Sequence, residues 1–145
     1  MRSAELQGEN VAGARLAART RAFASAVVAL VEELPRGRAA DVVGLQLLRA
    51  GTSVGANYRA ACRARSRREF IAKMGIVEEE ADECQFWIGL LRERDLFDPQ
   101  RLSSLLSEAS EILAMTVSSI RTARCVTRST PHSALRTPHS VSRCS

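Results

Sequence analysis

The stretch that decides the fold is SRREFIAKMGIVEEEADECQFWIGLL, residues 66–91. Its apolar residues recur at alternating intervals of four and three, at Phe70, Met74, Val77, Ala81, Cys84, Ile88 and Leu91. This spacing gives a helix one apolar stripe and is typical of helices that pack nearly parallel to one another. Ser66, with Glu69 three residues later, predicts a capping box at the start of this helix.

Segments on both sides carry the same helical periodicity. The spacing predicts a first helix from about 11 to 34, which LPRG terminates, and a second from about 38 to 62. After residues 66–91, Asp98 suits an N-cap and Pro99 the first helical position, so a fourth helix is expected from there to about residue 126. Four helices with short connections predict an all-α, antiparallel up-down-up-down four-helix bundle.

The predicted domain organisation is one bundle over residues 11–127, preceded by a flexible N-terminus, residues 1–10. Residues 128–145 are expected to be a disordered tail, rich in Ser, Thr, Pro and Arg and containing TPHS twice. The tail histidines, His132 and His139, are too isolated to predict a metal site.

Two glycines, Gly51 and Gly55, interrupt the second predicted helix, where each costs about 1 kcal/mol relative to alanine. They indicate either a close approach of a neighbouring helix or a local kink. Tyr58 follows on the apolar stripe of the same helix, so burial is expected for it.

No catalytic constellation is readable in the sequence. Ser53 does not lie in G-x-S-x-G, there is no phosphate-binding loop, and no histidine precedes His132 to complete a di-iron site. The cysteines form no C-x-x-C pair, and Cys62, Cys84 and Cys125 are expected as buried or half-buried thiols. The prediction is a protein that is not an enzyme and has no metal or cofactor.

Charge is segregated along the chain, whose net charge is +5. Residues 49–73 hold seven bases and one acid, and residues 74–98 hold eight acids and two bases. The longest uncharged apolar run, residues 22–31, is too short to span a bilayer, and the first ten residues lack the apolar region of a secretory signal. We therefore expect a cytoplasmic protein with no membrane partner.

Within the basic segment, NYRAACRARSRREF (residues 57–70) is the candidate site. The proposed nucleic-acid-binding residues are Arg59, Arg63, Arg65, Arg67, Arg68 and Lys73. The plain alternative is a solvated turn between two helices. Arg67 and Arg68 open a helix, where the macrodipole disfavours cations but free N–H groups favour a phosphate. Binding of this kind would be tolerant of sequence and steeply dependent on salt.

The acidic segment has a separate, structural interpretation. Glu80, Glu83 and Trp87 share a helical face beside the apolar stripe, where a half-buried carboxylate needs a basic partner. Arg49, in the middle of the preceding helix, is the predicted partner.

LQLLRAGTSVGANYRAACRARSRREFIAKMGIVEEEADECQFWIGLL, residues 45–91, resembles the bacterial four helix bundle protein family. That family includes proteins encoded in intervening sequences of large-subunit rRNA genes. The resemblance implies a homo-oligomer, commonly a ring of five, and a relationship to the accessory variability determinant of diversity-generating retroelements, which binds a reverse transcriptase and nucleic acid. It also implies structural roles for Arg49, Ser53, Asn57, Glu80 and Glu83.

The first predicted helix also carries apolar residues off its main stripe, at Ala22, Ala26 and Val28. They favour a subunit interface, although a wide core face would explain them too. Two functions stay open. One is RNA or DNA backbone binding, as a reverse-transcriptase accessory or in RNA processing. The other is a protein-interaction scaffold with an acidic protein partner and no nucleic-acid binding.

Overall fold

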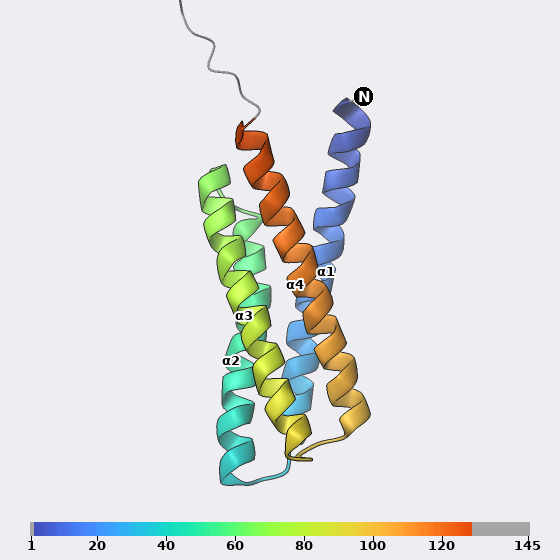
Figure 1. The fold of residues 1–145 in the computed structure, drawn as a ribbon, viewed down its shortest axis with the longest axis vertical. Coiled ribbons are helices and arrows are strands. Elements are labelled where there is room, and N and C mark those ends of the chain that lie inside the picture. The colour runs from blue at the N-terminus through green and yellow to red at the C-terminus, as the bar shows by residue number, and fades with distance from the viewer. Residues whose placement is uncertain (1, 129–145) are drawn as a thin grey trace, which may run out of the picture.

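The computed structural model of the protein describes residues 2–128, which form four helices and no strand (Figure 1). These helices are α1 (Arg2–Glu33), α2 (Arg38–Ala61), α3 (Arg67–Glu93) and α4 (Pro99–Arg128). The predicted tail, with its TPHS repeats, His132 and His139, lies outside the described residues apart from Arg128.

The helices run up, down, up and down around a common core, as predicted (Figure 1). α2 packs against α1 and α3, α4 packs against α3 and α1, and the diagonal pairs make no close backbone contact within residues 2–128. α1 and α4 are the most loosely packed neighbours. One end of the bundle therefore holds the start of α1, the α2–α3 turn and the end of α4.

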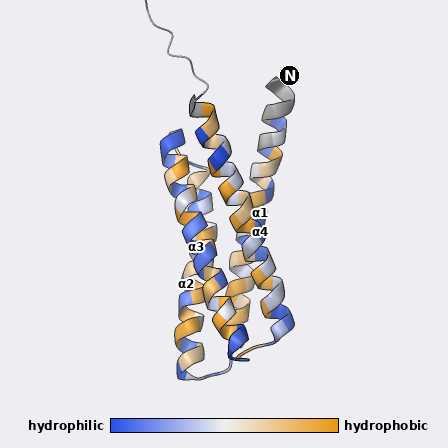
Figure 2. Cartoon of the chain, viewed as in Figure 1, coloured by the Kyte–Doolittle hydropathy of each residue, from blue (hydrophilic) through white to orange (hydrophobic). Residues whose placement is uncertain are grey.

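The predicted stripes form the core. On α3, the side chains from Met74 to Leu91 that belong to the heptad stripe are all fully buried. The other three helices contribute the remaining core residues, and hydropathy alternates along each helix as one-sided stripes require (Figure 2). Burial of these four stripes against one another is the main driving force for the fold.

The predicted caps are present. Ser66 Oγ accepts a hydrogen bond from the Glu69 N–H at 3.1 Å, and Asp98 Oδ1 accepts one from the Gln100 N–H at 3.0 Å. The Glu69 carboxylate accepts from the Arg65 N–H at 2.9 Å, one residue before the position a capping box uses. The bonds to Ser66 and Asp98 satisfy N–H groups that the first turn of a helix leaves free.

Gly51 and Gly55 of α2 allow α1 to pack closely against this helix. A Cβ at Gly51 would lie 2.8 Å from both Cγ atoms of Val27, and one at Gly55 would lie 3.3 Å from the Thr20 carbonyl oxygen. Side chains at these positions would hold the two helices apart. Of the two expected explanations, close packing is therefore the one that the structure supports.

Two expectations differ from the structure. α1 begins at Arg2 rather than near Val11, because residues 2–10 include the helix-favouring Ala4, Glu5 and Leu6. The prediction of buried thiols is confirmed for Cys84, but it is wrong for Cys62 and Cys125, which are exposed. Both lie near helix ends, where neighbouring helices no longer cover the side chain.

Candidate functional site

The predicted basic cluster comes together around the α2–α3 turn. Its members are Arg59 in the last turn of α2, Arg63 and Arg65 in the connection, and Arg67, Arg68 and Lys73 in the first two turns of α3. The five arginines are exposed and Lys73 is half-buried. Their charged groups are thus available to a partner outside the bundle.

No member of this basic cluster forms an ion pair with any other described residue. The nearest acid in sequence, Glu69, directs its carboxylate to the Arg65 backbone N–H as part of the helix cap. By contrast, Arg19, Arg49 and Arg101 are each paired with a glutamate. The basic cluster is therefore a concentration of positive charge that the described part of the fold does not neutralise.

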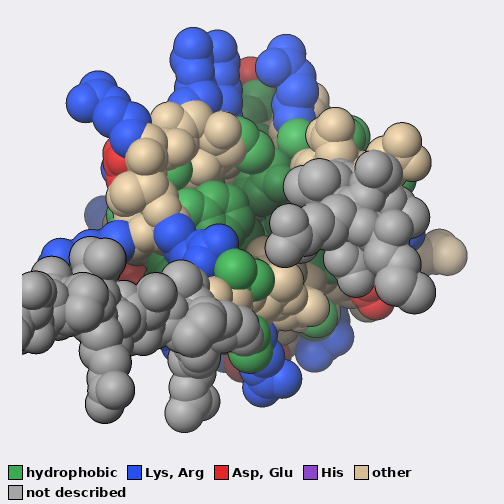
Figure 3. Space-filling view, turned by 90° about the horizontal axis from the view of Figure 1, so that it is seen from above, with side chains coloured by type: hydrophobic (Ala, Val, Ile, Leu, Met, Phe, Trp, Pro, Cys, Tyr) green, Lys and Arg blue, Asp and Glu red, His purple; other side chains and the backbone are tan. Residues whose placement is uncertain are grey.

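Three further arginines lie at the same end of the bundle, which we call the basic end. They are Arg15 on α1 and Arg121 and Arg124 on α4, and all three are exposed. Figure 3, which looks onto the basic end, shows Lys and Arg side chains around its margin and hydrophobic side chains between them. Sequence reasoning missed these arginines, although the run of bases without an acid after Arg121 was a signal for two of them.

The start of α3 is a weaker anion site than the sequence suggested. Ser66 Oγ already accepts from the Glu69 N–H, which is one of the N–H groups that a phosphate would otherwise meet. Recognition of an anion at this end would consequently depend on the guanidinium groups of Arg67 and Arg68 more than on the backbone.

The predicted partner of the acidic residues is confirmed. Arg49 donates to Glu80 Oε1 at 3.2 Å and to the Glu83 carboxylate, and Trp87 Nε1 donates to Glu83 Oε1 at 3.0 Å. The bond from Arg49, followed by the one from Trp87, holds the pKa of Glu83 below its ordinary value. This network ties α2 to α3 and leaves the Glu83 carboxylate occupied.

Ser53 and Asn57 bond to each other within α2. The Asn57 amide donates to the Ser53 carbonyl oxygen at 3.0 Å and to Ser53 Oγ at 2.9 Å. Ser53 is therefore tied into the helix, and no described histidine lies beside it to act as a base.

Tyr58 and Cys84 are removed from solution chemistry by burial. Tyr58 is buried, as expected, and its hydroxyl donates to the Gly13 carbonyl oxygen at 2.9 Å. Burial raises the pKa of Tyr58 above its ordinary value and raises the pKa of the Cys84 thiol to about 12. Tyr58 cannot stack on a nucleobase in this position, and Cys84 is a poor nucleophile.

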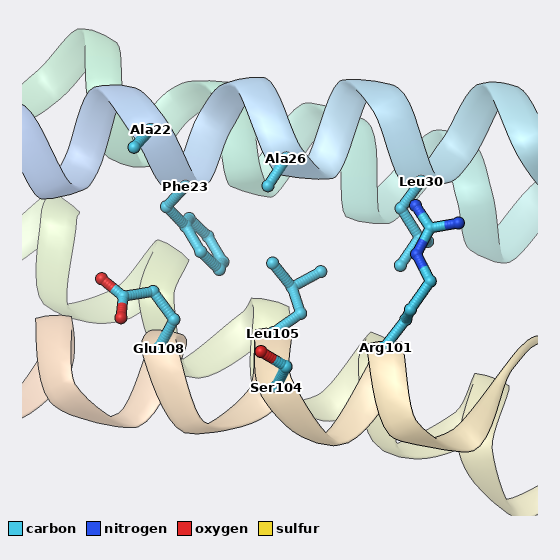
Figure 4. Close-up of a pocket in the computed structure, with 8 residues that line it drawn as sticks. All are labelled: Ala22, Phe23, Ala26, Leu30, Arg101, Ser104, Leu105 and Glu108. Carbon is cyan, nitrogen blue, oxygen red and sulfur yellow. The ribbon is translucent and has the colours of Figure 1, made fainter.

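α1 and α4 are joined by ion pairs that Arg19 and Arg101 form, with a groove of about 360 Å³ between the two helices (Figure 4). Arg19 donates twice to Glu108, both at 2.8 Å, and this lowers the pKa of Glu108. Arg101 pairs with Glu33. Figure 4 shows Phe23 and Leu105 directed into the space between Glu108 and Arg101, so the groove is apolar in its middle.

Within residues 2–128, no group of three or more His, Cys, Asp or Glu side chains is arranged to hold a metal ion. Among the described helices, none has an apolar stretch that would cross a bilayer. What the described residues do define is an antiparallel four-helix bundle with an arginine-rich end.

The chain belongs to the 23S rRNA-intervening sequence protein family, whose profile matches residues 15–118. A similar solved structure, from Bacteroides thetaiotaomicron VPI-5482, is described as a protein with unknown function from the S23 ribosomal protein family. It is 32% identical, with a TM-score of 0.71, and the match covers 76% of this chain and 98% of that chain. No curated protein matches significantly. The resemblance that the sequence showed is confirmed.

Proposed function

We propose that the protein is a non-enzymatic, oligomeric four-helix bundle that binds the RNA or DNA backbone through the basic cluster. The observation that carries this proposal is the exposure of five arginines that form no ion pair within the described part of the chain. A phosphate backbone supplies the regularly spaced anions that such a surface lacks.

The mechanism is electrostatic. Each phosphate that an arginine neutralises releases a condensed counterion, so affinity falls as salt rises. Contacts from the six members of the basic cluster would weaken binding by about 10³-fold between about 50 and 200 mM salt. Arg121 and Arg124 would steepen this dependence if the bound strand reaches α4.

The test compares two variants that lose the same charge from opposite ends. One changes four basic-cluster residues to alanine, namely Arg63, Arg65, Arg67 and Arg68. The control changes four arginines at the other end, which are also exposed and also without a described ion pair, namely Arg36, Arg38, Arg92 and Arg94. Binding of a labelled RNA and of duplex DNA is measured by anisotropy at several salt concentrations.

If the basic end is the site, the first variant loses about three units of the salt slope and the control keeps the wild-type slope. Equal losses in both variants would mean that binding follows total charge and that the basic cluster has no special role. Absence of binding by the wild-type chain would refute the proposal.

The oligomer is part of the proposal because apolar residues of α1 are left uncovered in the single chain. Ala22 and Ala26 are exposed, and Val28 is 37% exposed. A neighbouring subunit would bury them, and a ring of five is the assembly that the resemblance implies. Light scattering gives the mass of the assembly, and Val28→Glu is expected to lower it to that of a single chain.

Two settings fit a backbone-binding bundle of this family, namely an accessory to a reverse transcriptase and a factor in RNA processing. The test is co-purification of the tagged chain from its own cells at low salt. Recovery of a reverse transcriptase would favour the first setting, and recovery of rRNA fragments would favour the second.

The alternative function is a protein-interaction scaffold with an acidic partner. A second copy of the chain would itself be such an acidic partner, because Glu78, Glu79 and Asp82 line a groove of about 400 Å³ between α3 and α4. The basic end of one copy would then bind the acidic groove of its neighbour. In that case Glu79→Lys with Asp82→Lys would lower the mass of the assembly, and the wild-type chain would not bind RNA.

A further inference from the structure

Three grooves among the described residues differ in charge. The groove between α1 and α4 has Arg101 and Glu108 on its rim, and each is already paired with a residue of opposite charge. The groove between α3 and α4 is lined by three acids and would repel an anion. The third groove, between α1 and α2, has two arginines and no acid in its lining.

The α1–α2 groove has a volume of about 410 Å³, within the range of small-molecule sites. Its lining residues are Ala17, Thr20, Arg21, Ala24, Thr52, Gly55, Ala56, Tyr58, Arg59 and Cys62. Arg21 and Arg59 are exposed, and neither forms an ion pair with a described residue. The groove therefore combines an apolar floor with two available cations.

The groove is continuous with the basic end. Arg59 belongs both to the groove and to the basic cluster, and Cys62 marks the end of α2. From there the groove follows α2 back to Thr52, which corresponds to about 15 Å at the rise of a helix. A strand lying on the basic end could thus reach the groove with one of its nucleotides.

The polar groups of the groove are suited to a ligand that offers hydrogen-bond donors. The hydroxyls of Thr20, Thr52 and Tyr58 donate to backbone carbonyl oxygens of the chain, and Thr20 and Tyr58 are buried. Thr52 is exposed, and its hydroxyl oxygen still has acceptor capacity. An amino group of a nucleobase would match this acceptor, while Arg21 and Arg59 would match a phosphate.

Aromatic stacking, the usual way to hold an unpaired base, is not offered by the basic end. Of the six aromatic residues, Phe23 and Tyr58 are buried and Phe70 is packed against the core. Phe86, Trp87 and Phe97 lie in the second half of α3 or beyond it, toward the opposite end. A base that left its strand here would find the α1–α2 groove, in which the ring of Tyr58 is buried, and no open aromatic surface among the described residues.

We propose that the α1–α2 groove receives an unpaired nucleotide of a strand bound to the basic end. The base lies between the small side chains of α1 and α2, and its phosphate lies on Arg21 and Arg59. This inference rests on the proposed function and adds to it a preference for strands with unpaired nucleotides over continuous duplexes.

The first test fills the groove. Ala56 is exposed and lines the groove, whereas Ala39 is exposed on the same helix near the opposite end. Ala56→Leu is expected to weaken binding of a single-stranded RNA of about 12 nucleotides by about tenfold and to change duplex binding by less than about twofold. Ala39→Leu should change neither, and circular dichroism and light scattering confirm that both variants fold and assemble.

The second test detects occupancy directly. Cys62 lines the groove and Cys125 does not, although both thiols are exposed. Adenosine 5′-monophosphate and the single-stranded RNA should each slow alkylation of Cys62 by iodoacetamide, leave Cys125 unchanged, and lose this effect in Ala56→Leu. Protection by the RNA alone would still support the inference, because the strand supplies the nucleotide.

Unchanged single-strand binding by Ala56→Leu, with Cys62 alkylated at its free rate, would overturn the inference. The proposed function would survive that result if the variant with alanine at Arg63, Arg65, Arg67 and Arg68 still lost about three units of the salt slope. The proposed function itself would be refuted if neither single-stranded nor duplex RNA bound the wild-type chain.

Discussion

Substitution of Gly51 by alanine tests the close packing of α1 and α2 that shapes the α1–α2 groove. Gly51 is buried in α2, and a Cβ there would lie 2.8 Å from both Cγ atoms of Val27 and 3.0 Å from its Cβ. Contacts this short require either the Val27 side chain or one of the two helices to move. Val27 is β-branched and has essentially one rotamer in a helix, so its side chain cannot turn away and the helices must separate.

Two opposing effects determine how much Gly51→Ala changes the free energy of unfolding. Alanine in place of glycine in a helix interior stabilises by about 1 kcal/mol. Overpacking of a core costs about 1–3 kcal/mol, and the two contacts at 2.8 Å place Gly51→Ala in the upper half of that range. The expected net effect is a loss of about 1–2 kcal/mol in the free energy of unfolding.

Gly89, on α3, provides the matched control. It is half-buried in a helix interior, and a Cβ there would meet nothing within 4 Å. Gly89→Ala therefore keeps the helix-propensity gain without the steric cost, and it should stabilise by about 1 kcal/mol. Gly51→Ala is expected to lower the free energy of unfolding and Gly89→Ala to raise it, although the chemical change is the same.

Urea unfolding followed by circular dichroism measures these free energies. The Val27→Ala substitution closes a double-mutant cycle with Gly51→Ala, and it should cost less in the Gly51→Ala background because it relieves the contact. The reasoning fails if Gly51→Ala raises the free energy of unfolding as Gly89→Ala does, or if the cycle shows no coupling.

Three other predictions follow from single side chains. Thr116 has a fully buried hydroxyl with no hydrogen-bond partner among the described residues, so Thr116→Val should raise the free energy of unfolding by about 1 kcal/mol. Thr20→Val should not, because the equally buried Thr20 hydroxyl donates to a carbonyl oxygen at 3.1 Å. The pKa of Glu108 is lowered in the folded state, so its ion pair stabilises the fold above the ordinary carboxyl pKa and is lost as the pH falls through the folded value. Urea melts from about pH 6 to about pH 3 should show a smaller decline for Glu108→Gln than for the wild type. Iodoacetamide followed by mass spectrometry should label Cys62 in the native protein and Cys84 only after unfolding.

The fold was predictable because each helix carries its own signals. The heptad stripe of α3, the Ser66 cap and the Asp98 cap depend on neighbouring residues alone, so the sequence contains all the necessary information. The pairing of Arg49 with Glu80 and Glu83 was predictable for a related reason. Half-buried carboxylates on a known face of one helix require a cation from an adjacent helix, and few candidates exist.

Features that depend on how the helices are placed side by side were not predictable in this way. The exposure of Cys62 and Cys125 depends on where neighbouring helices stop covering them. The gathering of Arg15 and Arg121 near the α2–α3 turn depends on helix direction. The grooves depend on which faces of two helices meet, and periodicity within a single helix carries no information about that.

Helix direction also explains how a modest net charge becomes a local field. In an up-down-up-down bundle, the starts of α1 and α3 and the ends of α2 and α4 lie at one end. The described side chains near that end comprise nine bases and one acid, namely Arg15, Arg59, Arg63, Arg65, Arg67, Arg68, Lys73, Arg121 and Arg124 with Glu69. Near the opposite end, five bases are offset by six acids, namely Arg36, Arg38, Arg92, Arg94 and Arg101 with Glu32, Glu33, Asp41, Glu93, Asp95 and Asp98.

The consequence for binding is that position should matter more than total charge. A field that reaches only about 8–10 Å at physiological salt does not extend from one end of a long bundle to the other. Removing four arginines from either end changes the net charge equally, yet only the basic end loses charge that no described acid balances. The comparison of those two variants therefore separates a built phosphate-binding surface from the general attraction that any basic protein has for nucleic acid.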